Sequence, residues 1–457
     1  MNAPTLSARG VSSLAIDATA SADELEPEQA LARALELAGV TEPLPRPQVA
    51  TTRNRTITRR GVLWLGQTCN LRCYFCYFLD RIESREHPEH PFMSLDKAKE
   101  ICKTLVDVYG NNAIDIQGGE PTIWYAILDL VRYCHEIGLE PTLITNALVL
   151  ENLDKCKAYK EAGIRDFLVS VHGLGEVHDR VVQLSGAHVR QMKALANLRK
   201  VGIPYRFNCV LSKPVVSQLP QIAELAVKTG ALVVNFLAFN PFEDQGNGGR
   251  RSSNNVPRYS ELRDSLNRAL DVLDAAGVEA NVRYYPLCMV EERHRKSMYN
   301  FQQLSYDHHE WDYASWSWTG QQPQRMKQGP VSPTLPLTGQ RLAWKTRRMR
   351  EGIARLRVVG PAFLRAEKTI GRLGDRMRGR DALYRENARV RSELHCGYVY
   401  SSECQRCDLK AICDGFHGDY AAMFGTGEAV AVHCGGKVAD PLHFIAAQDK
   451  IVENGAP

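Results

Sequence analysis

The chain has 457 residues, of which 44% are hydrophobic and 24% are charged, and its formal net charge is +5. These ordinary globular proportions exclude a mainly disordered, collagenous or coiled-coil protein, and the mild charge by itself does not indicate a nucleic-acid partner. No stretch approaches the roughly 18 apolar residues of a membrane span, and the N-terminus lacks the pattern of a secretory signal. We therefore expect a cytoplasmic protein, in which clustered members of the 13 cysteines bind metal rather than form disulfides.

Residues 1–58 are predicted to form a loosely ordered N-terminal arm. They are rich in Ala, Glu, Pro and Thr, and they contain one amphipathic helical pattern, from Ala22 to Leu37. A disordered tail is an equally good interpretation of this composition.

Residues 59–290 alternate short apolar runs with segments of helical periodicity. Runs that are continuous, rather than alternating with polar residues, are typical of parallel strands covered on both faces. The expected strands are Gly61–Leu65, Ala113–Gln117, Pro141–Thr145, Asp166–Val171, Tyr205–Val210, Leu232–Phe239 and Val278–Tyr284. The expected helices lie between Ser94 and Gly110 and at 122–137, 151–162, 187–201, 217–229 and 258–276. The alternation predicts an α/β fold with a parallel sheet, in fewer units than the eight of a complete barrel.

Residues 291–392 break this rhythm, and we expect them to be an aromatic and basic linker or insertion. The aromatic stretch 306–318 could form a lid over a barrel site. Within 341–391 there are 16 Lys and Arg against 5 Asp and Glu, a local net charge of +11. This stretch could meet an acidic or phosphorylated partner, and a solvated helical face is an equally good interpretation.

A first cysteine cluster, Cys69, Cys73 and Cys76, follows the first expected strand. Three thiolates spaced C-x3-C-x2-C in a loop can bind three irons of a cubane cluster and leave the fourth iron open. An open metal position suits a catalyst better than an electron carrier. A zinc site with a distant fourth ligand is the alternative, although zinc ligands are usually paired as C-x2-C twice.

This loop resembles that of the radical S-adenosylmethionine (SAM) superfamily, which has an aromatic residue before the last cysteine, here Phe75. The superfamily's second hallmark, a Gly-Gly-Glu-Pro element after the second strand, stands at Gly118, Gly119, Glu120 and Pro121. The resemblance covers about residues 60–290. It implies a partial (β/α)6 TIM-type barrel, a [4Fe–4S] cluster bound to three cysteines with one open iron, and SAM as the cofactor on that iron.

The resemblance also implies roles for individual residues. Gly118–Glu120 would accept hydrogen bonds from the SAM ammonium group, with glycine allowing the backbone to approach the ligand closely. Ser170 and Asn208, at expected strand ends, could contact the SAM ribose or carboxylate. The enzyme would be a radical SAM oxidoreductase that receives its electron from a flavodoxin- or ferredoxin-type reductant.

A second cysteine cluster lies in residues 393–445, whose cysteine density predicts a small domain organised by metal. The spacing Cys404-x2-Cys407-x5-Cys413, with Cys434 further on, resembles the SPASM or twitch auxiliary-cluster domains of radical SAM enzymes. The resemblance implies an auxiliary [4Fe–4S] cluster held by these four cysteines. A zinc ribbon is the alternative. The superfamily's next cysteine is replaced by His417, which leaves a second auxiliary cluster, with Cys288 and Cys396 as further candidate ligands, open.

We expect a small-molecule substrate, such as a sugar, a nucleotide or a specialised metabolite. We expect the residues before Gly61 to be too few for the leader-binding domain that peptide-modifying relatives often carry. Modification of a ribosomally made peptide or protein is the first alternative. A non-catalytic iron–sulfur protein for electron transfer or sensing is the second, but such a protein needs neither an open iron nor the Gly118–Pro121 element.

Overall fold

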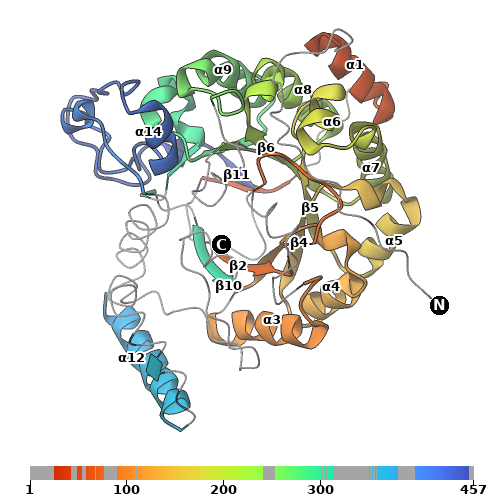
Figure 1. Ribbon diagram of the computed structural model, residues 1–457, viewed down its shortest axis with the longest axis vertical. Coiled ribbons are helices and arrows are strands. Elements are labelled where there is room, and N and C mark those ends of the chain that lie inside the picture. The colour runs from red at the N-terminus through yellow and green to blue at the C-terminus, as the bar shows by residue number, and fades with distance from the viewer. Residues whose placement is uncertain are drawn as a thin grey trace, which may run out of the picture.

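In the described part of the chain, nine parallel strands form one curled sheet at the centre of the molecule, with helices along its outer face (Figure 1). The computed structural model describes residues 25–42, 49–53, 58–66, 68–76, 90–109, 111–239, 253–300, 302–303, 306–311, scattered positions from 349 to 358, 359–378 and 397–451. The strand order is β10-β2-β3-β4-β5-β6-β7-β8-β9. The strands are β2 (Thr58–Trp64), β3 (Ala113–Gln117), β4 (Glu140–Thr145), β5 (Asp166–Ser170), β6 (Tyr205–Leu211), β7 (Val233–Ala238), β8 (Glu279–Arg283), β9 (Met298–Tyr299) and β10 (Tyr306–Trp311).

All seven strands expected between residues 61 and 284 are present, and their ends lie within three residues of the expected positions. The α/β fold class and the partial barrel are therefore confirmed. Because the strands are parallel, their carboxyl ends meet at one rim of the sheet, which is where folds of this kind place their ligands.

Helices cover the convex side of the sheet (Figure 1). They are α3 (Leu95–Tyr109), α4 (Ile127–Glu136), α5 (Leu153–Glu161), α6 (Glu176–Val182), α7 (Ala187–Val201), α8 (Leu219–Thr229) and α9 (Tyr259–Ala275). The first of them shows why the sequence folds this way. The Ser94 hydroxyl caps α3 by accepting the Lys97 N–H, and Leu105 packs so closely on β2 that a Cβ at Gly61 would lie 2.6 Å from its Cδ1. The short helix α6 is an element that the periodicity did not predict.

The N-terminal arm is more ordered than the sequence indicated, where the structure describes it. Helix α1 (Pro27–Leu37) buries Ala30, Leu31 and Ala34 against α7 and α8. The Arg199 guanidinium also donates a hydrogen bond to the Ala38 carbonyl, 2.9 Å away. The arm is held because its small apolar face fits the groove between two barrel helices. Strand β1 (Thr51–Thr52) pairs antiparallel with β11 (Lys450–Ile451), at the other end of the described chain.

Residues 306–311, expected in the linker, instead form β10 beside β2. The register pairs Tyr306 with Thr58 and Trp311 with Leu63, so the strand runs parallel to the rest of the sheet. Its four central residues are polar and lie between Tyr306 and Trp311, so it lacks the continuous apolar run of the other strands, which is why the sequence did not reveal it. The rest of the aromatic stretch up to residue 318 lies outside the described residues.

The basic stretch contains helix α12 (Val359–Arg378), which stands apart from the barrel in Figure 1. Its apolar residues Val359, Ile370, Leu373 and Met377 are exposed. Among the described residues, no helix combines the length and apolar character needed to cross a bilayer.

The C-terminal segment, residues 397–451, packs against the amino end of α9 (Figure 1). It contains helix α14 (Gly418–Phe424), whose Tyr420 ring stacks on Tyr259 with centroids 3.7 Å apart. The Tyr420 hydroxyl accepts the Tyr259 N–H at 2.8 Å and donates to the Glu428 carboxylate. These contacts fix the second cysteine cluster against the barrel.

Candidate active site and a second cysteine cluster

The first cysteine cluster lies in the loop that follows β2, at the carboxyl rim of the sheet. Backbone hydrogen bonds tie this loop to α6: the N–H groups of Arg72 and Tyr74 donate to the carbonyls of Val182 and Val181. The Arg72 guanidinium also donates to the Cys69 carbonyl at 2.8 Å. The unexpected helix α6 therefore holds the loop in place.

The thiols of Cys69, Cys73 and Cys76 form no disulfide and are half-buried. Burial raises the pKa of Cys69 to about 12, and the charges of Glu120 and Cys76 add to the rise. Burial and the charges of Cys76 and Cys69 raise the pKa of Cys73 well above its usual value. The three sulfurs are thus close enough to repel one another as thiolates, so the ionised set needs a positive partner such as bound metal.

Gly118 and Gly119 brace the cysteine loop from the neighbouring strand. Both have left-handed backbone angles, with φ of +99° and +56°. A Cβ at Gly118 would lie 2.6 Å from the Gly66 carbonyl oxygen, and one at Gly119 would lie 2.0 Å from that of Thr68. The sequence suggested that these glycines make room for a ligand. In the structure they make room for the protein's own backbone, immediately before Cys69.

The carboxylate of Glu120 connects the ends of two strands. It is 1% exposed and accepts four hydrogen bonds. The donors are the Thr122 N–H and hydroxyl, which follow β3, and the Thr145 hydroxyl and Asn146 N–H, at the end of β4. The Asn146 amide in turn donates to the side chain of Asn70 in the cysteine loop, at 2.8 Å. Burial raises the pKa of Glu120, and these hydrogen bonds oppose the rise. Four protein groups therefore hold this carboxylate in place between the ends of two neighbouring strands.

Ser170 and Asn208 face each other in the register of β5 and β6, close to the carboxyl rim. The Ser170 carbonyl accepts a hydrogen bond from the Gln191 amide on α7, at 2.9 Å. Gln191 is fully buried and also donates to the Asn146 carbonyl, at 3.2 Å. Sequence reasoning missed Gln191, because a lone glutamine on an apolar helix face gives no signal of its contacts.

The ring of Phe75 packs edge-on against His172, with centroids 4.7 Å apart. Burial lowers the pKa of His172 to about 3, so the ring is neutral. Its Nδ1 accepts the Val210 N–H at 3.2 Å, which places the ring proton on Nε2. The parallel ring of His178 lies behind it at 6.4 Å, and burial and the neighbouring rings of His188 and His172 lower the pKa of His178 as well.

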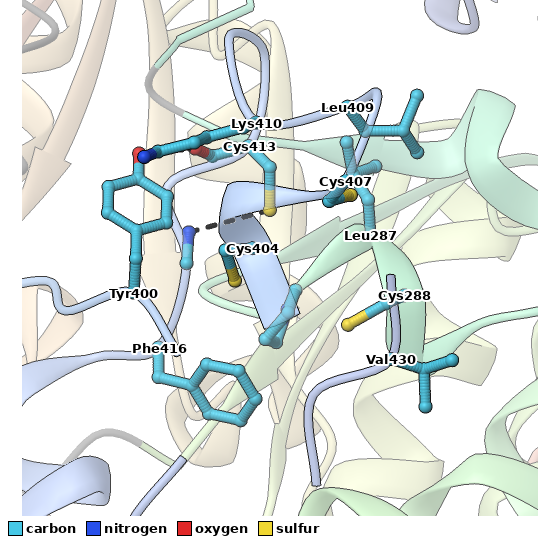
Figure 2. A pocket seen from close by; sticks show the side chains of 12 residues that line it. Leu287, Cys288, Tyr400, Cys404, Cys407, Leu409, Lys410, Cys413, Phe416 and Val430 are labelled. Carbon is cyan, nitrogen blue, oxygen red and sulfur yellow. Dashed lines mark hydrogen bonds between the residues drawn. The ribbon is translucent and has the colours of Figure 1, made fainter. Parts of the chain in front are cut away.

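A cavity lies between the barrel and the C-terminal segment, next to the second cysteine cluster (Figure 2). Cys404, Cys407 and Cys413 line it, together with Cys288 from the loop after β8. Cys434 does not line this cavity, and its side chain is exposed. Its thiol interacts electrostatically with Cys407, so it lies nearby.

The other candidate ligands of a second auxiliary cluster are placed differently. His417 is buried, and its Nδ1 caps α14 by accepting the Asp419 N–H at 3.3 Å. Cys396 lies outside the described residues. Within the described ranges, no three His, Cys, Asp or Glu side chains are arranged around a position for a single metal ion.

Comparison with known proteins gives a consistent family. Residues 65–226 match the model of the Radical SAM superfamily. The chain is 26% identical to the probable GTP 3',8-cyclase of Sulfurisphaera tokodaii over 48% of its length and 67% of that relative. It is 28% identical to the AdoMet-dependent heme synthase of Methanosarcina barkeri, over 40% of this chain and 51% of that protein. It is 30% identical to the PqqA peptide cyclase of Rhodopseudomonas palustris, over 37% of this chain and 44% of that protein.

Solved structures match more loosely. Streptococcus suis SuiB bound to S-adenosylmethionine is 20% identical, with a TM-score of 0.40 over 52% of each chain. Native anSMEcpe with bound AdoMet and a peptide gives a TM-score of 0.37 and 17% identity, over 49% of this chain and 63% of that one. The chain thus spans between 44% and 67% of the length of these relatives and solved structures.

Proposed function

We propose that the protein is a radical SAM oxidoreductase, because residues 65–226 match the model of the Radical SAM superfamily. When bound, a reduced [4Fe–4S] cluster would supply the electron that cleaves SAM to a 5'-deoxyadenosyl radical, which abstracts a hydrogen atom from the substrate. The cofactors would carry out the bond cleavage, and the residues of this chain would bind them, orient them and exclude water.

The observation that carries this proposal is the group of three half-buried thiols, none of them in a disulfide, on a braced loop. Cys69, Cys73 and Cys76 fit a cluster because they are unbridged, half-buried and close enough to sense one another's charge. Three cysteines would bind three irons, which leaves the fourth for the amino and carboxylate groups of SAM. The rigid contact between Thr68 and Gly119 would fix that loop against the second strand.

SAM would lie along the carboxyl rim, next to the cysteine loop. Because the Glu120 carboxylate already accepts hydrogen bonds from four protein groups, we propose that the backbone of Gly118–Glu120, rather than the side chain, accepts the SAM ammonium. The side chains of Ser170 and Asn208 would contact the ribose or carboxylate, and Phe75 would cover the site from the loop.

We propose a small molecule as the substrate. Two of the three relatives named above have names that refer to small molecules, GTP and heme, and the third has the name of a peptide cyclase. Deuterium transfer into 5'-deoxyadenosine from labelled candidates would distinguish these classes. Transfer from a peptide, with none from small molecules, would favour the maturase alternative.

The experiment that tests the function is the detection of 5'-deoxyadenosine after anaerobic reconstitution, reduction and addition of SAM. Wild-type protein should form it, and Cys73→Ala should abolish it without unfolding the barrel. Cys156→Ala is the matched control, since Cys156 is a buried cysteine on α5 that packs in the core. A wild-type protein that makes no 5'-deoxyadenosine, although its cluster is intact by Mössbauer spectroscopy, would contradict the proposal.

A further inference from the structure

The cavity of the second cysteine cluster has four thiols in its wall, and one of them comes from the barrel. Cys288 lies in the 3-10 turn Leu287–Met289, which follows β8, whereas Cys404, Cys407 and Cys413 belong to the C-terminal segment. Figure 2 shows the four sulfur atoms on different sides of one space. The barrel and the C-terminal segment therefore both contribute thiols to one cavity.

The remaining wall suits an iron–sulfur cluster. Leu287, Leu409, Phe416 and Val430 give it an apolar lining. Two backbone N–H groups point at the sulfurs: Gly415 donates to Cys413 Sγ at 3.4 Å, and Val432 donates to Cys407 Sγ at 3.5 Å. Hydrogen bonds to sulfur and exclusion of solvent are two of the features by which proteins tune such clusters.

Cys434 occupies a different position, although the spacing of the cysteines favoured it as a ligand. Its side chain is exposed, and its N–H donates to the Asp408 carboxylate at 2.8 Å. The same carboxylate forms an ion pair with Lys437 at 3.3 Å. Cys434 is therefore held on the surface side of the segment, while Cys288 faces the cavity from within the fold.

We propose that a single auxiliary [4Fe–4S] cluster is bound by Cys288, Cys404, Cys407 and Cys413, with Cys434 outside its ligand set. This inference rests on the iron–sulfur chemistry of the proposed function. A cubane does not need the four sulfurs to converge on one ion, because each thiolate binds a different iron. The cluster would join the barrel to the C-terminal segment, since one ligand comes from the first and three from the second.

The test uses the full chain with Cys69, Cys73 and Cys76 all changed to Ala, so that only the auxiliary site can hold iron. After anaerobic reconstitution, we measure iron, zinc and acid-labile sulfide, together with the Mössbauer spectrum. The parent triple variant should hold about four irons per chain. Adding Cys434→Ala should preserve that content, whereas adding Cys288→Ala should remove most of it. Cys407→Ala is the positive control, because both ligand sets include it.

Circular dichroism and the conservative Cys288→Ser variant separate ligand loss from misfolding. A folded Cys288→Ser protein should lose iron or show an altered Mössbauer spectrum. The proposal is overturned if Cys434→Ala removes the iron while Cys288→Ala retains it, or if the site holds zinc without sulfide. It is also overturned if the triple variant takes up no iron. If, in that case, the wild type still makes 5'-deoxyadenosine, the proposed function stands without the auxiliary site.

Discussion

Replacing Gly119 by Ala tests whether the contact between the second strand and the cysteine loop is needed by the fold itself. The new Cβ would lie 2.0 Å from the Thr68 carbonyl oxygen, 2.6 Å from its carbon and 2.9 Å from its nitrogen. The same oxygen accepts the Glu120 N–H at 2.9 Å. The methyl group would therefore force the backbone next to Cys69 outward and break this hydrogen bond.

Gly138→Ala is a matched control for the backbone strain. Gly138 has a φ of +72°, similar to the +56° of Gly119, but a Cβ there would meet no atom within 4 Å. Ala in the left-handed region costs roughly 1–2 kcal/mol at either position. Only Gly119→Ala adds overpacking, about 1–3 kcal/mol, and a lost hydrogen bond, about 0.5–1.5 kcal/mol. We expect it to lower the free energy of unfolding by about 2–4 kcal/mol more than Gly138→Ala does.

Urea denaturation of the metal-free, reduced proteins measures this difference through the transition midpoints at a common slope. Iron uptake on reconstitution is the second readout. Gly119→Ala should impair it because the loop of Cys69 is displaced, and Gly138→Ala should not. Equal losses of stability in the two variants would refute the packing argument, since backbone strain alone would then explain both.

Two further predictions concern buried carboxylates. Glu120→Gln places an amide group among four hydrogen-bond donors, so it should lower the free energy of unfolding by about 1–3 kcal/mol in thermal or urea unfolding. The control Glu161→Gln, at an exposed position, should change the free energy of unfolding by less than about 0.5 kcal/mol. Asp166 is buried, which raises its pKa, but the charges of Arg206 and Arg165 outweigh burial and the net pKa is lowered. Because the pKa of Asp166 is lower in the folded than in the unfolded state, its ionised form stabilises the fold at pH values above the unfolded-state pKa of about 4. This stabilisation is lost as the pH falls through the folded-state pKa. The stability gap between wild type and Asp166→Asn should therefore narrow as the pH is lowered below about 4, and a constant gap would contradict this assignment.

The sheet could be predicted from the sequence because each central strand is a continuous apolar run between turn residues. Asp166–Ser170 and Tyr205–Leu211 are examples whose ends matched closely. Two elements could not be found in this way. Helix α6 has seven residues, too few for a clear period, and β10 lacks an apolar run because Asp307–Glu310 is polar. The position of β10 beside β2 depends on pairing between distant segments, which local sequence patterns do not reveal.

In the candidate site, too, residues close in sequence could be predicted, and contacts between distant elements could not. Spacing identified Cys69, Cys73 and Cys76, because ligands from one loop must be close in sequence. It could not reveal that Glu120 accepts hydrogen bonds from the next strand, or that Cys288 lies beside Cys404. Those contacts join residues from different elements, so only the fold brings them together.

The pairing of β1 with β11 has a mechanical consequence. Lys450 and the Ile451 N–H also reach Glu279 on β8, and the Gln448 amide donates to the Ala280 carbonyl at 2.9 Å. The C-terminal segment is thus fastened to the barrel at its tail as well as through Tyr420. Because the segment is anchored at two points, a hinge motion would have to break both sets of contacts, so we expect the distance between the two cysteine clusters to be fixed by the fold.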